Sequence, residues 1–181
     1  MLGDLNPHEI EALLTNEVVG RIGCHANGVT YVVPITYAYN EGYVYAHSKE
    51  GMKIQMMRLN PMVCFEIDNM EDPENWQSVI TWGRFEELKG DHRRSGLEKI
   101  TERLCSRKSS ETSMPSLETD AGYQNSMGPY KGIIYRIKLL EKSGKYEMKN
   151  TATPFKPPIE KRKPRKLTIK ALGYDKGQAG I

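Results

Sequence analysis

The chain has 181 residues, of which 38% are hydrophobic and 27% charged, a length and composition that fit one globular domain with a tail. Its net charge of +3 is unevenly spread, because residues 151–181 hold eight Lys or Arg against two acidic residues. The first 150 residues are slightly acidic, which excludes a basic nucleic-acid-binding body. We therefore expect a domain at 1–150 and a basic Pro/Lys-rich C-terminal tail at 151–181, with no nucleic acid as a partner of the domain.

The cysteines Cys24, Cys64 and Cys105 are far apart, and no C-x-x-C pair occurs. This spacing predicts neither a disulfide framework nor a zinc site, and it favours a reducing cytoplasm. No apolar run approaches the roughly 20 residues that cross a bilayer, and the N-terminus lacks the pattern of a signal peptide. We expect no membrane association, and the four dispersed histidines predict no metal cluster.

The first half of the chain predicts one helix followed by antiparallel strands. Asn6 can cap a helix that starts at Pro7, with Glu9 completing a capping box, and this helix would end near residue 15. Residues 17–48 then alternate as a β-meander. Its turns are predicted at Asn27-Gly28 and at residues 40–42.

The second half continues with a short helix at 52–60, a strand at 61–68, a polar loop at 69–77 and a strand at 78–88. Asp91 opens a helix with apolar residues at helical spacing, and a polar stretch follows at 106–130. The last strand, at 131–149, is predicted to turn at Ser143-Gly144. Short antiparallel strands with tight turns indicate a β-barrel or sandwich with helices packed outside it.

Pro34 lies inside the longest predicted strand, at 29–40. Proline cannot donate a hydrogen bond to a neighbouring strand, so we do not expect a fully paired central position there. Either this part of the strand is an edge or bulge, or the chain passes a ligand there.

In the stretch YVYAHSKEGMKIQMMRLNP, residues 43–61, a predicted strand is followed by a predicted helix. The polar corner between them comprises residues 47–53. Ser48 offers a hydroxyl, Gly51 permits close approach to the backbone, and Lys53 adds a charge beside the positive end of the helix dipole. These groups suit a phosphate, although the spacing is not that of a P-loop. A capped helix with a solvated lysine explains the pattern equally well.

Three other residues have two interpretations. His47 ends a strand at this corner and is either a satisfied polar residue or part of the anion site. Trp76 and Trp82 flank a β-branched strand, where tryptophan is commonly core or dimer interface, and where it also stacks on cofactors.

Residues 17–88, and more weakly 131–140, resemble the pyridoxamine 5′-phosphate oxidase-like FMN-binding split-barrel proteins, in the branch that contains nitroimidazole-resistance proteins. The segments that carry the resemblance are, in order, GRIG, VPITY, YAHSKEGMK, NPMVCFE and WQSVITWG. It implies a mainly β fold, a six-stranded antiparallel split barrel with flanking helices. It also implies a homodimer with two FMN sites at the interface.

The resemblance assigns FMN-binding roles to three segments. The main chain of Val33, Pro34, Ile35 and Thr36 would lie along the flavin ring. His47, Ser48 and Lys53 would hold the phosphate and ribityl end, and Gln77, Ser78 and Val79 would close on the flavin. Many family oxidases have Arg where this chain has Met52, so one cation is missing unless another residue such as Arg58 replaces it.

The function implied is a flavin-dependent oxidoreductase or reductase of a small organic compound, with NAD(P)H or a reductase as electron donor. The C-terminal R-x-H pattern of true pyridoxamine phosphate oxidases is absent, which argues against vitamin B6 oxidation. The alternative is a non-catalytic flavin- or haem-binding protein on the same barrel. No catalytic residue is predicted.

Overall fold

The structure is a computed structural model of the chain, and it describes residues 1–105 and 132–149. All of them belong to one compact unit, Met1–Thr151. The polar stretch at 106–130 and the predicted tail at 151–181 lie outside the described residues. The domain boundary near residue 150 therefore stays a prediction.

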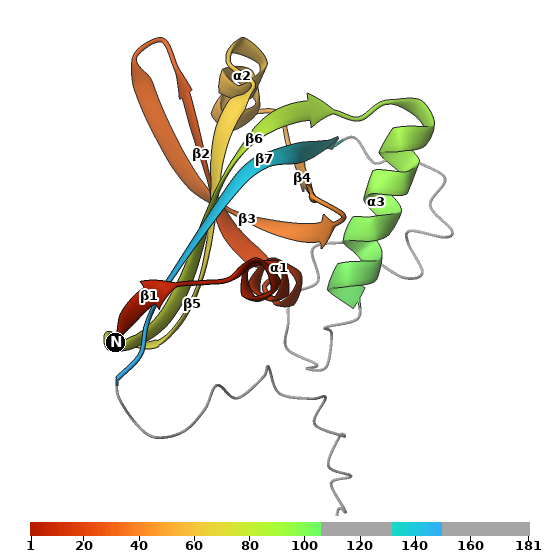
Figure 1. Ribbon diagram of the computed structural model, residues 1–181. Coiled ribbons are helices and arrows are strands. Elements are labelled where there is room, and N and C mark those ends of the chain that lie inside the picture. The colour runs from red at the N-terminus through yellow and green to blue at the C-terminus, as the bar shows by residue number, and fades with distance from the viewer. Residues whose placement is uncertain (106–131, 150–181) are drawn as a thin grey trace, which may run out of the picture. The chain divides into compact units, whose positions relative to one another are not determined.

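Antiparallel strands form one sheet in the order β1-β7-β4-β3-β2-β5-β6, and an additional pairing of β7 with β6 closes it into a barrel (Figure 1). The strands are β1 (Leu2–Asp4), β2 (Val19–Ala26), β3 (Val29–Asn40), β4 (Tyr43–Ser48), β5 (Met62–Asp72), β6 (Asn75–Glu87) and β7 (Ile133–Glu147). The mainly β barrel confirms the predicted fold class. The described sheet has seven strands where six were expected, because the three-residue β1 adds to the end of β7.

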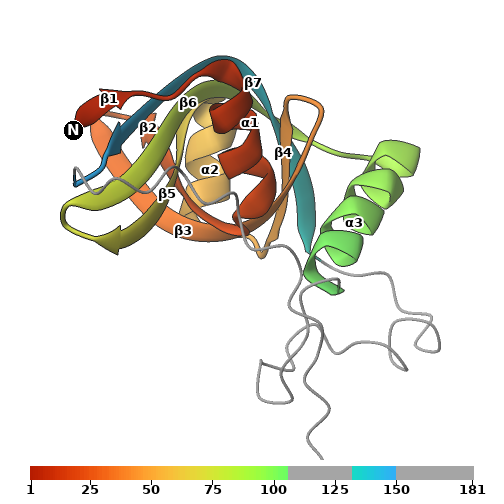
Figure 2. The ribbon, with the colours of Figure 1, turned by 60° about the horizontal axis from the view of Figure 1, so that its bottom comes forward.

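Three helices accompany the described strands: α1 (Pro7–Asn16), α2 (Met52–Leu59) and α3 (Gly90–Cys105). In the view of Figure 2, α1 and α2 lie within the outline of the barrel and α3 lies outside it. The predicted capping box starts α1, with the Asn6 side chain accepting from the Glu9 amide at 3.0 Å. Ile100 of α3 packs with Tyr45 and Ile134 in a second, smaller apolar cluster.

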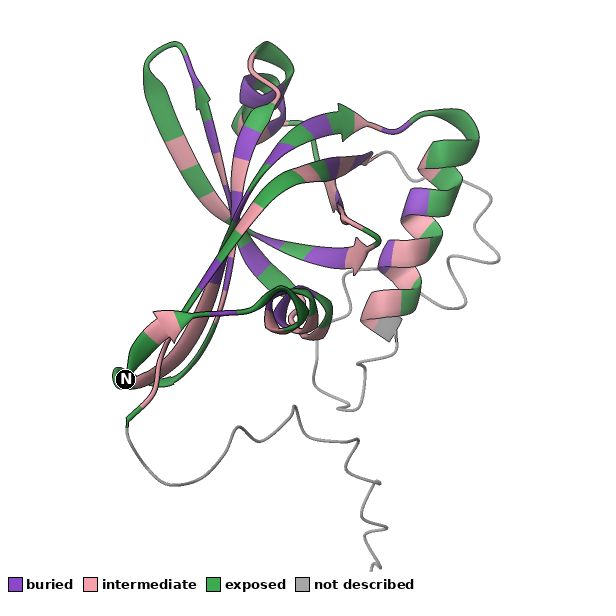
Figure 3. Cartoon of the chain, in the orientation of Figure 1, coloured by how far each residue is buried: buried purple, intermediate pink, exposed green. Residues whose placement is uncertain are grey.

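The main core fills the barrel, because side chains on alternate strand positions point inward. In β2 the buried positions are even-numbered, as at Ile22 and Cys24, whereas in β5 and β6 they are odd-numbered, as at Phe65 and Val79. Figure 3 shows this alternation of buried and exposed residues along the strands. The outward positions of β2, β3, β5 and β6 therefore form a continuous outer face.

Two local predictions were wrong. The polar loop expected at 69–77 is instead the end of a long hairpin, in which Asn69 pairs with Gln77 and Met70 with Trp76. The turn expected at Ser143-Gly144 does not form, since β7 continues through both residues. Gly144 instead allows close packing against Leu5, because a Cβ added at Gly144 would lie 2.8 Å from the Leu5 Cβ.

Candidate functional site

The first half of β3 is paired on one side only. Residues 29–36 pair with β2, whereas β4 pairs only with residues 37–40. The Tyr37 amide donates to the Val18 carbonyl at 2.9 Å, so alternation turns the backbone groups of Pro34 and Thr36 away from β2. The pairing of Tyr37 with Ala46 uses the Thr36 amide, whereas no described strand pairs with Pro34, which has no N–H and interrupts no ladder. This agrees with the interpretation of Pro34 as a local edge, and it leaves backbone groups of the predicted ring-binding segment open.

The N-terminus of α2 has no side-chain cap, in contrast to α1. Gly51 occupies the N-cap position, and Ser48, the nearest hydroxyl in the predicted corner, donates to the Lys49 carbonyl at 2.8 Å instead. A Cβ built on Gly51 would meet nothing within 4 Å, so the backbone is open on that side. No described side chain therefore caps the first turn of α2, which leaves its amides available to an anion.

Lys53, in that first turn, is half-buried rather than solvated. Its Nζ lies 6.0 Å from the centroid of the Tyr135 ring, and no described carboxylate forms a salt bridge with it. Burial lowers the pKa of Lys53, partly offset by the nearby Cys24 thiol. The alternative of a capped helix with a solvated lysine does not describe this corner. Among the described residues, this corner holds a cation without a counter-charge.

His47 is the last residue but one of β4, where it pairs with Ile134 of β7, and Ser48 ends the strand. Burial lowers the pKa of His47, and the positive charge of Lys53 lowers it further. The ring is therefore neutral at pH 7, so His47 adds no further positive charge beside Lys53.

Arg58 does not replace the cation missing at Met52. It lies in the last turn of α2, where its Nη1 bonds Glu50 at 2.8 Å and its Nε bonds Glu87. The guanidinium is thus already paired with two carboxylates, Glu87 and Glu50, the latter just before the N-cap Gly51. Met52 itself is exposed.

Gln77, Ser78 and Val79 lie away from the other predicted residues within one chain. The order β3-β2-β5-β6 places two strands between them and Pro34, so the separation is about 14 Å at ~4.8 Å per strand. Val79 is fully buried, and the Ser78 hydroxyl donates to Glu66 at 3.2 Å. Val33–Thr36, His47, Ser48 and Lys53 thus gather on one side of the barrel, and the β6 residues do not join them.

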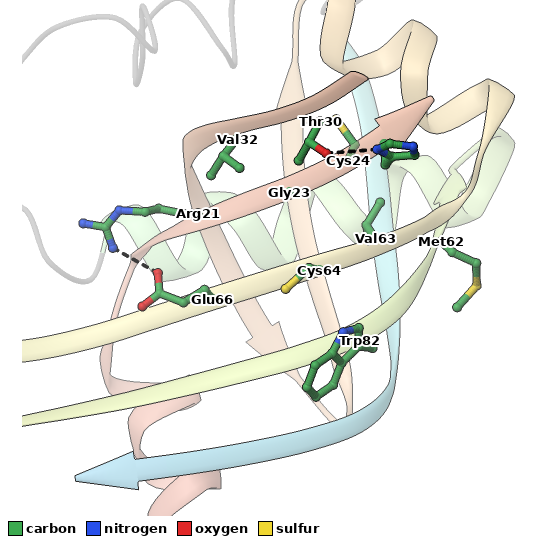
Figure 4. Close-up of a pocket in the computed structure, with 11 residues that line it drawn as sticks. Arg21, Gly23, Cys24, Thr30, Val32, Met62, Val63, Cys64, Glu66 and Trp82 are labelled. Carbon is green, nitrogen blue, oxygen red and sulfur yellow. Dashed lines mark hydrogen bonds and ion pairs between the residues drawn. The ribbon is translucent and has the colours of Figure 1, made fainter. Parts of the chain in front are cut away.

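An apolar groove of about 500 Å³ lies on the outer face between these two groups (Figure 4). Gly23 forms its floor, because Gly23 pairs with Val32 on one side and Cys64 on the other, and Cys64 pairs with Trp82. Trp82 is 42% exposed, so it is not a core residue; its interface and stacking interpretations stay open. Trp76 is half-buried, and its indole donates to Glu147 at 3.2 Å. The only sequence feature that pointed to this groove was Trp82.

Comparison with known proteins identifies the family. A family model described as pyridoxamine 5′-phosphate oxidase matches residues 6–128. The chain belongs to this family. An uncharacterized protein of Rhizobium meliloti (strain 1021), RA0666, is 33% identical over 84 residues, which cover 46% of this chain. The alignment spans 56% of that relative's length, little more than half.

Several solved structures share the fold. A FAD-binding protein from Mesorhizobium loti is 27% identical, with a TM-score of 0.62 over 81% of this chain and 98% of that one. A putative 5-nitroimidazole antibiotic resistance protein from Bacteroides thetaiotaomicron is 20% identical, with a TM-score of 0.59 over 81% and 87%. A heme binding protein from Mycobacterium smegmatis is 14% identical, with a TM-score of 0.56 over 76% and 54%. The family comparison confirms the resemblance and the flavin-binding type of split barrel.

The corner of this family member fits the phosphate of a flavin nucleotide. Uncapped amides of α2, open space at Gly51 and the unpaired cation of Lys53 suit an anion, and the open backbone edge of β3 suits a ring with polar groups along one side. The described residues contain no cluster of three or more His, Cys, Asp or Glu that could bind a metal ion. No described helix is long and apolar enough to cross a membrane.

Proposed function

We propose that this chain binds FMN and acts as a flavin-dependent oxidoreductase on a small organic compound. The observation that carries the proposal is Lys53, a half-buried cation with no described acidic partner, in the first turn of an uncapped helix. In a low-dielectric position such a charge is unfavourable until an anion arrives, which is the behaviour expected of a phosphate ligand.

Each part of the corner then has a role toward the cofactor. Lys53, the first amides of α2 and the Ser48 hydroxyl would hold the phosphate, with neutral His47 adding a hydrogen bond on the ribityl side. The open carbonyl groups of Pro34 and Thr36 would orient the ring. Bound flavin itself supplies the electron and hydride chemistry, whereas the protein supplies orientation and electrostatics.

A homodimer belongs to the same proposal. Gln77–Val79 lie about 14 Å from Pro34 across the sheet, so one copy does not bring them to the same flavin. A second copy of the chain would supply its own β6 residues to the site of the first. The exposed apolar side chains of Val32, Met62 and Trp82 on the face between the two groups support such a contact. We expect the dimer to work in the cytoplasm, with NAD(P)H or a reductase as electron donor.

The absorption spectrum of the purified full chain tests the cofactor. A yellow protein that releases FMN on denaturation is expected, and reduction of the flavin by NADH, NADPH or an added reductase tests turnover. Flavin that no donor reduces would leave a non-catalytic flavin protein. A Soret band would indicate haem, the alternative that the fold likeness to the M. smegmatis protein favours. Colourless protein that does not respond to FMN titration would refute both. Light scattering checks the dimer.

A further inference from the structure

The hydroxyl of Tyr135 is the one buried side-chain polar atom of the described residues that has no hydrogen-bond partner. Tyr135 is fully buried in the main core, so its hydroxyl has lost its hydrogen bonds to water, and no described group replaces them. Tyr37 makes a matched comparison: it is equally buried, yet its hydroxyl donates to the Leu14 carbonyl at 2.9 Å. A buried polar atom left unpaired in an otherwise satisfied core indicates a partner that the described residues do not provide.

The surroundings of Tyr135 indicate what that partner is. The Lys53 ammonium lies 6.0 Å from the centroid of its ring, and the Phe85 ring packs at 5.4 Å. Cys24, the other polar group near enough to influence Tyr135, already donates to the Tyr31 carbonyl at 3.5 Å. The Lys53 ammonium, which has no described acidic partner, therefore lies over the ring that carries the unpaired hydroxyl. A single anionic ligand between them would satisfy both.

We propose that the Tyr135 hydroxyl donates a hydrogen bond to the phosphate of the bound flavin, next to Lys53. This rests on the proposed function and adds a residue to it that the sequence comparison did not assign. It also accounts for the cation missing at Met52. Arg58 is held by Glu50 and Glu87, so the corner supplements Lys53 with a neutral donor.

A neutral donor suits this position because it adds a hydrogen bond without a second buried charge. Burial raises the pKa of Tyr135, so the hydroxyl keeps its proton at any physiological pH and acts as a donor. The arrangement should favour FMN over riboflavin, which has the same ring and ribityl chain but no phosphate.

Tyr135→Phe in the full chain tests the proposal, with FMN and riboflavin titrated in parallel by flavin fluorescence. We expect the Kd for FMN to rise about tenfold, as for a lost hydrogen bond to a charged group, while the Kd for riboflavin is unchanged. The flavin-free variant should unfold at the same or a higher temperature than the wild type, because an unpaired buried hydroxyl has been removed.

Tyr37→Phe is the matched control. It removes a hydroxyl of equal burial that has a partner, so the unfolding temperature should fall while the ratio of the two Kd values stays that of the wild type. A second measurement needs no variant: the exchange-protected Tyr135 hydroxyl proton should shift downfield in the NMR spectrum on addition of FMN, and not of riboflavin.

The outcomes separate this inference from the proposed function. Wild-type protein that binds FMN while Tyr135→Phe binds it equally well would overturn the role of Tyr135 alone. Equal losses for FMN and riboflavin, or a variant that unfolds at a lower temperature, would indicate a structural hydroxyl bonded to a buried water. Wild-type protein that binds no flavin would overturn both proposals.

Discussion

Replacing Lys53 by Met should separate phosphate binding from every other contribution to flavin affinity. Methionine keeps most of the apolar stem that packs in the half-buried position, and it removes only the charge. A hydrogen bond to a charged group contributes about 1.5–3 kcal/mol, so the Kd for FMN should rise about 10- to 100-fold. Riboflavin affinity should not change. Because burial lowers the pKa of Lys53, the flavin-free protein carries a cost for its charge, and Lys53→Met should not lower its stability.

Fluorescence titration of both flavins at several salt concentrations measures the effect. Lys49→Met is the control, because Lys49 is an exposed lysine of the same corner and its loss changes net charge equally. The FMN affinity of Lys53→Met should also depend less on salt than that of the wild type. The reasoning is refuted if Lys53→Met binds FMN as tightly as the wild type. It is also refuted if FMN and riboflavin lose affinity equally, since the lysine would then serve the fold.

Three further predictions concern the neighbouring groups and the tail. Burial and Lys53 lower the pKa of His47 below its usual 6.5, so the folded state loses stability as the pH falls below that value and His47 must be protonated. His47→Gln should therefore lose less stability than the wild type between pH 7 and pH 5 in urea titrations. An equal loss of stability in the two proteins would contradict this. Arg58→Met should leave FMN affinity unchanged and cost little stability, because both of its ion pairs are largely exposed; a weaker FMN complex would show that Arg58 leaves its carboxylates to bind phosphate. Deleting residues 151–181 should leave flavin content and the dimer intact, and loss of either in absorbance or light scattering would show that the tail packs on the body.

Turns with a local cause were predictable, and turns set by distant contacts were not. At Asn27-Gly28 both residues have positive φ, 50° and 75°, which the two residue types adopt readily, so the hairpin was predicted correctly. Gly144 was mistaken for a turn residue because its real constraint comes from Leu5 and Ile10, which lie far away in sequence. A glycine selected for close packing looks the same in a sequence as a glycine selected for a turn.

The same distinction holds for the candidate site. Ser48, Gly51 and Lys53 follow one another along the chain, so their proximity could be inferred without a structure. Tyr135 could not be found that way, because its place depends on the register of β7 opposite Ala46 and Glu87. Whether its hydroxyl has a partner is a property of the packed barrel, and no local pattern reports it.

The pairing of β7 also has a consequence for how the chain folds. Residues 133–138 pair with β4 and residues 135–147 with β6, so this strand alone joins the two free edges of the sheet. Until it has left the ribosome, β4 and β6 remain unpaired edges, which are prone to associate with other chains. Contacts this distant in sequence also slow folding. Ribosome-bound chains stalled before Ile133 should therefore be protease-sensitive and bind chaperones. Protection from proteases should appear only once Glu147 has emerged from the ribosome. Compact, protected chains before that point would contradict this order of events.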